Sequence, residues 1–218
     1  VRGVVSVIGK LEDVLKQQGN DVLISVDITR ADVAEAVIEA GATIINDVAA
    51  GREDDRMFAL AADRRVPIVL MHMQGEPGTM QDNPTYDDVV GDVLAFLMDR
   101  IAAAKQAGIA DDRIAIDPGI GFGKTREHNL ALLTALSKFV ATGYPVLLGT
   151  SRKRFMGSIC TPTGSTEPPK PHELIGATCA TTALGVVAGV QMFRVHDVKP
   201  NRQAADVALA ITPSRHTR

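Results

Sequence analysis

The sequence predicts an α/β fold built on a parallel sheet. Short apolar runs alternate with amphipathic stretches along the chain, and each run stays apolar until it ends in polar residues. Parallel strands that are buried on both faces have this near-continuous apolar pattern. Six βα units follow one another, and such an unbroken alternation indicates either a doubly wound sheet or a (βα)8 barrel.

The expected elements begin with a helix over residues 4–18. Six strands follow it, at residues 23–27, 43–47, 67–73, 113–117, 145–150 and 191–197. Apolar residues at helical spacing mark two helical stripes, one with Val89, Val93, Leu97 and Ile101 and the other with Leu130, Leu133 and Leu136. Residues 161–171 are rich in Pro, Gly, Ser and Thr, so we expect a mobile loop there.

Composition limits the classes of protein to which the chain can belong. At 218 residues and 45% hydrophobic, it is long enough for a single domain over residues 1–218 with a substantial core. A net charge of -3 gives no overall field for nucleic acid or an anionic membrane. Cys160 and Cys179 have neither metal-ligand spacing nor the density of a disulfide scaffold. We expect a soluble cytoplasmic protein with no nucleic-acid or membrane partner.

The most informative segment runs from residue 114 to residue 125. A β-branched run ends in Asp117, and Pro118 and three glycines then turn the chain before a Lys-Thr pair. A nucleotide P-loop would need glycine where Pro118 stands, which excludes that motif. Asp117 is therefore expected at the carboxyl end of a strand, where a buried carboxylate must be paired or bound to a ligand.

Other polar residues also fall at or just after the predicted strand ends. They are Asp27, Asn46, His72, Ser151, Arg152, Lys153, Arg194 and His196. The carboxyl ends of parallel strands share one face, so these residues are expected to line one pocket with Asp117. Carboxylates and an amide suit the N–H edge of a flat nitrogen heterocycle, and the basic residues suit a phosphate or diphosphate.

Several of these residues also have a purely structural interpretation. Asp27 or Asn46 alone would more often cap a helix than bind a ligand, and for Asp47 we expect the cap. Met71 is individually more typical of core filling. His72 fits an interior histidine as well as a ligand contact, and Arg154 is expected on a solvated face.

Four segments together resemble dihydropteroate synthase, a pterin-binding family. They are residues 70–75, 117–124, 149–155 and 194–197, in the family's order, and residues 44–47 fit as well. The resemblance implies a (βα)8 TIM barrel of the pterin-binding class, with six βα units visible in this chain. It also implies the condensation of 6-hydroxymethyl-7,8-dihydropterin diphosphate with 4-aminobenzoate to 7,8-dihydropteroate and diphosphate, a step of folate biosynthesis.

The resemblance implies roles for the strand-end residues at the pterin. Asp117 and Asn46 would hydrogen-bond the ring, and Asp27 would lie on its other edge. Met71 and Phe122 would line the pterin slot.

Basic and hydroxyl residues would serve the other substrate groups. Lys153 would reach the acceptors of the ring, and Arg194 would lie over the ring and bind the diphosphate together with His196. Ser151, Arg152 and Phe155 would shape the aminobenzoate site. The residues expected to act in catalysis are Lys153, Arg194, His196 and Asp27.

The same resemblance implies a missing part and leaves alternatives open. The family begins with two strands and their mobile loops, which this sequence lacks, so we expect an N-terminally incomplete barrel. Mg²⁺ is the implied cofactor, but the family's metal-associated Asn lies in the missing part, so no metal ligand is assigned. A homodimer is also implied. The alternatives are a non-catalytic pterin-binding or partner protein and a methyltetrahydrofolate-binding methyltransferase domain.

Overall fold

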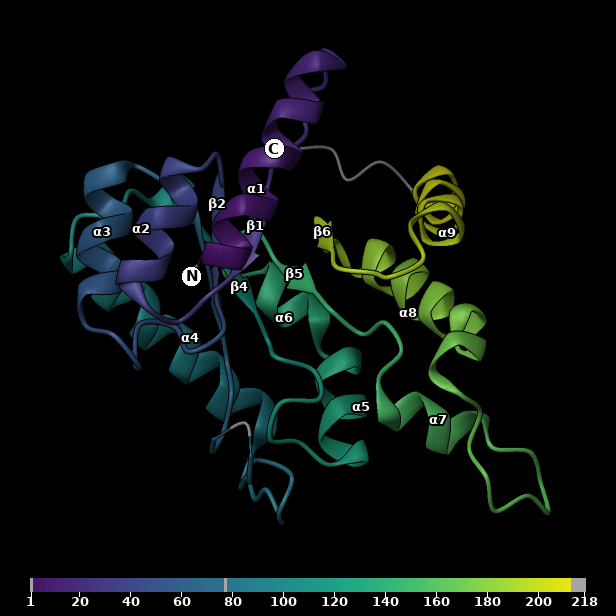
Figure 1. Cartoon of the computed structure of the whole chain (residues 1–218). Coiled ribbons are helices and arrows are strands. Elements are labelled where there is room, and N and C mark those ends of the chain that lie inside the picture. Colours follow the sequence, from purple (N-terminus) through teal and green to yellow (C-terminus); the bar gives the residue numbers. More distant parts are fainter. Residues whose placement is uncertain (1, 77, 213–218) are drawn as a thin grey trace. The chain divides into compact units, whose positions relative to one another are not determined.

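The structure is a computed structural model that describes residues 2–76 and 78–212 (Figure 1). All six predicted strands are present: β1 (Ser25–Asp27), β2 (Ile44–Asp47), β3 (Ile68–Met71), β4 (Ile114–Asp117), β5 (Leu147–Leu148) and β6 (Met192–Phe193). They are shorter than predicted. Pro67 and Pro145 contribute to this because proline has no N–H to give to a ladder.

Helices separate the strands as the alternation predicts. They are α1 (Arg2–Gln17), α2 (Ala31–Glu39), α3 (Arg56–Arg64), α4 (Val89–Gln106), α5 (Arg126–Thr134), α6 (Leu136–Val140), α7 (Arg154–Cys160), α8 (Ile175–Ala188) and α9 (Val198–Ile211), with 3-10 turns η1 (Asp111–Arg113) and η2 (Pro171–Glu173). The chain forms two compact units, Val1–His72 with Ala95–Ile116 and Met73–Leu94 with Asp117–Arg218. The expectation of one domain over residues 1–218 stays a prediction.

The first unit is built on parallel strands in the order β1-β2-β3, with β4 beside β3. The register pairs Asp27 with Asn46 and Asn46 with Val69, so these residues stand at one level across three strands. Residues paired across parallel strands project to the same face of a sheet. The register therefore places Asp27 and Asn46 next to each other.

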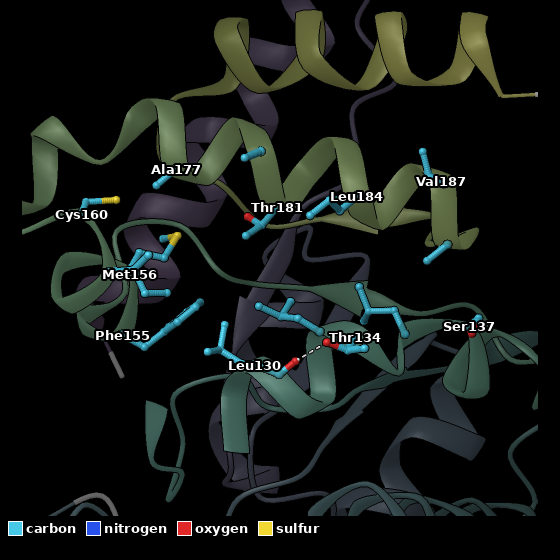
Figure 2. A pocket seen from close by; sticks show the side chains of 15 residues that line it. Leu130, Thr134, Ser137, Phe155, Met156, Cys160, Ala177, Thr181, Leu184 and Val187 are labelled. Carbon is cyan, nitrogen blue, oxygen red and sulfur yellow. Dashed lines mark hydrogen bonds between the residues drawn. The ribbon is translucent and has the colours of Figure 1, made fainter. Parts of the chain in front are cut away.

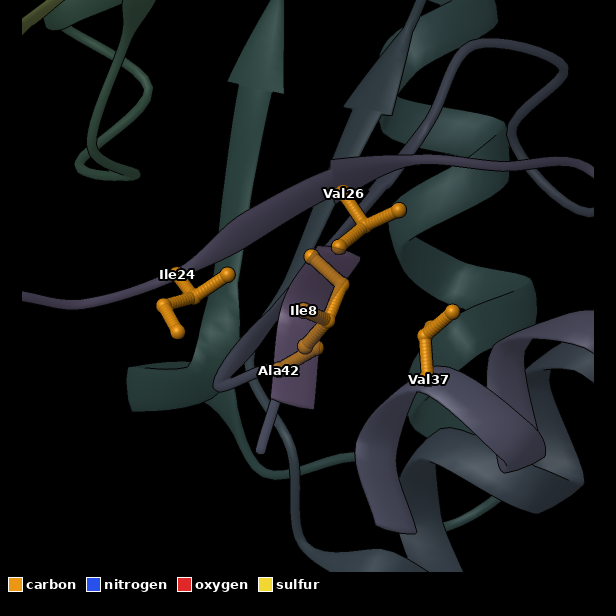
Figure 3. Close-up of a cluster of buried hydrophobic side chains, with 5 residues drawn as sticks. All are labelled: Ile8, Ile24, Val26, Val37 and Ala42. Carbon is orange, nitrogen blue, oxygen red and sulfur yellow. The ribbon is translucent and has the colours of Figure 1, made fainter. Parts of the chain in front are cut away.

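A small apolar core joins α1 to the sheet of the first unit. Ile8 of α1 packs with Ile24, Val26, Val37 and Ala42 (Figure 3). This contact confirms the predicted first helix, whose apolar positions repeat at helical spacing. The stripe on α4 is confirmed too, because all four of its residues are at most 8% exposed.

The second unit holds the parallel pair β5-β6 and the helices α5 to α9. Helices α8 and α9 are joined by a buried hydrogen bond of 2.7 Å from the Thr182 hydroxyl to Asn201 Oδ1. Gly185 lies where a Cβ would collide with the ring of Phe193, at 2.7 Å, so this glycine lets α8 pack closely on β6. None of the helices in the described ranges combines the length and hydropathy needed to cross a membrane.

The predicted stripe of Leu130, Leu133 and Leu136 is only partly right. The helix ends at Thr134 and a new one begins at Leu136, so Leu136 is buried while Leu130 is 38% exposed. Leu130 lines an apolar groove of about 760 Å³ bounded by α5, α6, α7 and α8, in which Phe155, Met156 and Leu184 also take part (Figure 2). The predicted loop contains no helix or strand from residue 161 to residue 170, and its mobility stays a prediction.

Candidate pterin site

In the first unit, two predicted residues meet at the ends of β1 and β2. Asn46 Nδ2 donates a hydrogen bond of 2.8 Å to Asp27 Oδ1. Asn46 is 4% exposed, and its Oδ1 has no hydrogen-bond partner among the described residues. A buried acceptor left unpaired costs about 1–3 kcal/mol. The amide oxygen of Asn46 is therefore suited to accept an N–H from a ligand.

Neither Asp27 nor Asp47 caps the helix that follows it, contrary to the structural interpretation of these residues. Helix α2 has Arg30 at its N-cap position without a side-chain bond, so Asp27 does not cap it. Asp47 does not cap a helix either: its carboxylate accepts from Ala49 N at 3.0 Å and from Gly51 N at 2.6 Å, and it closes the turn after β2. Burial raises the pKa of Asp47. The turn that it closes follows Asn46 directly.

Met71 and His72 occupy the end of β3 in the same unit. Met71 is 2% exposed, as both the core interpretation and the ligand-lining one require. The imidazole of His72 meets the ring of Phe96 edge-on, with the ring centroids 4.9 Å apart. This contact is typical of an interior histidine.

In the second unit, Asp117 is a buried carboxylate at a strand end, as predicted. It is 6% exposed, and its Oδ1 accepts from Gly119 N at 2.7 Å. Burial raises its pKa, while the charges of Lys153, Lys124 and Arg194 act in the opposite direction. Such a group is stabilised as an anion by any ligand that gives it N–H bonds.

The glycines after Asp117 allow unusually close packing. Gly121 has φ 81° and Gly123 has φ 60°, in the left-handed region that glycine enters without strain. A Cβ on Gly121 would lie 2.9 Å from Cδ of Lys153, and one on Gly123 would collide with the backbone oxygen of Gln74. Any other residue at either position would push these neighbours away.

Two lysines extend into this loop. The Lys153 ammonium donates to the backbone oxygen of Ile120 and lies 4.4 Å from the ring centroid of Phe122. Burial lowers the pKa of Lys153 to about 8, with Asp117 opposing the shift. Lys124 is 3% exposed and donates to the backbone oxygen of Phe122 at 3.0 Å, and burial lowers its pKa to about 7. Lys124 lies in the Lys-Thr pair of the sequence motif, but no role for it was predicted.

The residues after β5 and β6 also meet. The Ser151 hydroxyl lies 2.9 Å from Nδ1 of His196 and accepts from the His196 backbone N–H at 3.2 Å. Arg152, at φ 60°, binds Asp197 in a fork with Nη2–Oδ1 at 3.0 Å and Nε–Oδ2 at 3.2 Å. No pattern in the sequence predicts Asp197 as this partner. Arg194 is exposed, and its backbone N–H donates to Leu148 O at 3.1 Å.

A cavity of about 610 Å³ opens beside the glycine-rich loop. The charged side chains among its lining residues are all basic: Lys124, Arg126, Arg152, Lys153 and Arg154. Phe122 and Phe155 supply two aromatic walls. Arg154 is exposed, as predicted for a solvated residue, yet it borders the cavity. The cavity is suited to an aromatic anion.

The predicted site residues thus form two groups. Asp27, Asn46 and Met71 belong to the first unit, and Asp117, Phe122, Ser151, Arg152, Lys153, Phe155, Arg194 and His196 belong to the second. Within residues 2–76 and 78–212, no three His, Cys, Asp or Glu side chains cluster in a way that could hold a metal ion.

The fold and these groups define a pterin-binding protein, and the chain belongs to the pterin binding enzyme family, whose pattern matches residues 2–196. Its similar relatives are dihydropteroate synthases. The one from a Synechocystis strain is 38% identical over 89% of this chain, and one from Streptococcus pyogenes is 46% identical over 86% of it. The chain spans 65% and 66% of these relatives' own lengths.

Solved structures agree with the sequence relatives. Dihydropteroate synthase from Xanthomonas albilineans in complex with 7,8-dihydropteroate is 39% identical, with a TM-score of 0.84 over 97% of this chain and 73% of that one. The same enzyme with 4-aminobenzoic acid is 40% identical, with a TM-score of 0.83 over 96% and 70%. The predicted fold class, a (βα)8 barrel of the pterin-binding class, is confirmed for the six βα units in this chain.

Proposed function

We propose that this chain carries out the dihydropteroate synthase reaction of folate biosynthesis, a group transfer between two small substrates. The amine nitrogen of 4-aminobenzoate bonds to the methylene carbon of 6-hydroxymethyl-7,8-dihydropterin diphosphate. The C–O bond to the diphosphate breaks, its electron pair leaves with the diphosphate, and the amine gives up one proton. The products are 7,8-dihydropteroate and diphosphate.

The observation that carries this proposal is the buried carboxylate of Asp117 with Lys153 and Phe122 around it. A carboxylate accepts two parallel N–H bonds, as the amino-pyrimidinone edge of a pterin provides. The ammonium of Lys153 stands at an aromatic ring 4.4 Å away and can donate to ring acceptors. Asp27 and Asn46 are proposed to bind the pterin too, through the Asn46 oxygen that lacks a partner among the described residues.

The remaining residues are proposed to serve the departing and attacking groups. Arg194 and His196, at the end of β6, would bind the diphosphate and stabilise the charge that develops on it. The basic cavity beside Phe122 and Phe155 would hold 4-aminobenzoate, whose carboxylate matches the all-basic charged lining. No side-chain nucleophile is needed because the amine attacks carbon directly.

We propose Mg²⁺ only as an ion that binds together with the diphosphate. When bound, it would neutralise part of the diphosphate charge, and Mg²⁺ is commonly held by substrate phosphates with one or two protein groups. Because the described residues contain no three-ligand cluster, none of them is assigned to the metal.

We further propose that the protein is a homodimer in a cytoplasmic compartment. Apolar side chains stand exposed on α8 and α9, among them Leu184 and Leu209 at 66% each and Ile211 at 74%. An exposed apolar patch of this kind marks a protein interface more often than open surface. Cys160 and Cys179 are free thiols, which supports a reducing compartment.

Product formation tests the proposed function. The protein is incubated with pterin diphosphate, 4-aminobenzoate and Mg²⁺, and 7,8-dihydropteroate is measured by mass spectrometry. The variant Asp117→Asn is assayed in parallel. We expect product with the wild type and at most a trace with the variant. Pterin diphosphate binding without product would favour the non-catalytic alternative, and binding of methyltetrahydrofolate in preference to the diphosphate would favour the methyltransferase.

A further inference from the structure

Four consecutive backbone oxygens of the glycine-rich loop each accept a hydrogen bond from a side chain. The donors to residues 120, 121, 122 and 123 are, in order, Lys153 Nζ, Gln81 Nε2, Lys124 Nζ and Tyr86 Oη. Backbone oxygens in such a turn would otherwise be bonded to water, because no helix or strand pairs them. The loop therefore takes its shape from side chains outside residues 120–123.

Two of these donors come from one segment, the connection between β3 and α4. Gln81 Nε2 donates to Gly121 O at 2.6 Å, and Tyr86 Oη donates to Gly123 O at 2.8 Å. The Tyr86 ring also meets His128 edge-on, with centroids 4.9 Å apart. His128 in turn completes a capping box with Thr125 at the start of α5. Tyr86 thus contacts both the loop and the helix that follows it.

The same connection touches the loop through its backbone. Gly123 lies so close to the carbonyl of Gln74 that no side chain would fit. Gln74 Nε2 donates to Thr85 O at 3.0 Å, which ties the two ends of residues 74–85 together. The connection therefore contacts the loop at Gly121 and twice at Gly123.

We propose that Gln81 and Tyr86 are positioning residues, which act on the ligand through the glycine-rich loop. By fixing the oxygens of Gly121 and Gly123, they hold Phe122 beside Lys153 and keep the loop after Asp117 in one conformation. This inference rests on the proposed function, since the ligand whose affinity depends on the loop is the pterin diphosphate.

The donors are suited to a permanent contact. Burial raises the pKa of Tyr86 to about 12, so its phenol stays protonated and can donate throughout the neutral range. Gln81 carries no charge to titrate.

The test compares single-atom and isosteric variants. Tyr86→Phe removes only the hydroxyl and keeps the ring against His128, Gln81→Leu removes the donor at similar size, and Tyr144→Phe, at the chain's other tyrosine, is the control. Pterin diphosphate affinity is measured by calorimetry, melting temperature by scanning calorimetry, and loop protection by amide hydrogen exchange of residues 117–125.

We expect Tyr86→Phe and Gln81→Leu each to bind pterin diphosphate about five- to tenfold more weakly, which is the loss expected for one hydrogen bond. Tyr144→Phe should bind it as the wild type does. Exchange in residues 117–125 should accelerate, and the melting temperature should change by no more than it does in Tyr144→Phe. Because both residues act on one loop, the double variant should lose less than the product of the two single losses.

Two results would overturn the inference. Unchanged exchange in residues 117–125 would show that the donors do not hold the loop, whatever the ligand. Accelerated exchange with wild-type affinity would show that the loop conformation does not matter for binding. A wild type that binds no pterin diphosphate would instead refute the proposed function and the ligand part of the inference, while the exchange result still decides whether the loop is held.

Discussion

The two units of the chain hold their strand-end polar residues in different ways. In the first unit, an exposed carboxylate, Asp27, is paired with a buried amide, Asn46, and the amide keeps one acceptor without a partner among the described residues. In the second unit, Asp117 and Lys124 are buried ionisable groups with Lys153 beside them, and each has a shifted pKa. In the proposed site, the first group would recognise the pterin through the geometry of its hydrogen bonds, and the second through charge.

This difference has a consequence for pH and stability. An amide does not titrate, so the Asn46 contact is available at every pH. Buried charges oppose folding unless they are paired, and the second unit keeps a carboxylate and two ammoniums together in one place. Functional sites often contain buried ionisable groups, because binding and catalysis require particular protonation states that burial and neighbouring charges set.

The largest expected effect on pterin affinity is that of Asp117→Asn. An amide can accept only with its oxygen and turns a donor towards the ring N–H groups, so pterin affinity should fall at least a hundredfold, about 2.7 kcal/mol. Calorimetric titration with pterin diphosphate measures it, with Asp112→Asn at an exposed position as control. Tight binding by the Asp117 variant would remove this residue from the site.

The same titration has a pH signature. Burial raises the pKa of Asp117, and only the ionised carboxylate accepts two N–H bonds. Wild-type affinity should therefore weaken as pH falls through that raised pKa, and the residual binding of Asp117→Asn should not share this dependence.

Lys124→Met should change stability. The lysine pKa is 10.5 unfolded and about 7 folded, so between these values the unfolded state holds a proton that the folded state has lost. Wild-type stability should rise over that interval, and below pH 7 the full cost of the buried ammonium remains. At about 1.4 kcal/mol per pKa unit, and allowing for one lost hydrogen bond, we expect the variant to be more stable by about 3–4 kcal/mol at pH 6. At pH 10 this gain should have almost disappeared, because the wild-type lysine is then neutral in the folded state and the pH is close to its pKa of 10.5 in the unfolded state.

Urea unfolding at pH 6, 8 and 10 checks this expectation. Lys138→Met, at an exposed position, should show no such change with pH. A Lys124 variant less stable than the wild type at pH 6 would mean that the ammonium is well paired after all.

The smallest effect is expected for Asn46→Ala, in the first unit. The change removes the amide oxygen that has no hydrogen-bond partner among the described residues, and Asp27 stays exposed. Pterin affinity should fall about fivefold, close to 1 kcal/mol, while stability changes little. Calorimetric titration with pterin diphosphate measures this loss, with Asn20→Ala at an exposed position as the control. If Asn46→Ala and the wild type bind with equal affinity, pterin recognition is limited to the second unit.

The sequence predicted the strand ends because two signals coincide there. An apolar run followed at once by a polar residue marks both the strand and its functional end, which located Asp27, Asn46 and Asp117. The registers of β1 and β2 then confirm that Asp27 and Asn46 are neighbours. Their cap interpretation failed because a cap depends on where the next helix begins, and α2 and α3 begin several residues later.

Contacts between distant loops could not be predicted in this way. Gln81 and Tyr86 lie about 40 residues from the oxygens that they bind, and a donor to a backbone oxygen leaves no periodicity in the sequence. The fork of Arg152 on Asp197 has the same character, since either residue alone reads as solvated. The break between α5 and α6 was missed because Leu136 continues the apolar spacing across Ala135.

The hydrogen-bonded oxygens of residues 120–123 belong to the main chain, and no substitution can delete a main-chain oxygen. Side-chain changes at Ile120 or Phe122 can alter bulk but leave every acceptor in place. Heritable variation in the shape of this loop must therefore arise at the glycines or at the donor positions 81, 86, 124 and 153. Of the four donor residues, Gln81 is the exposed one, so a substitution there can change the shape of the loop with the least disturbance of the surrounding side chains.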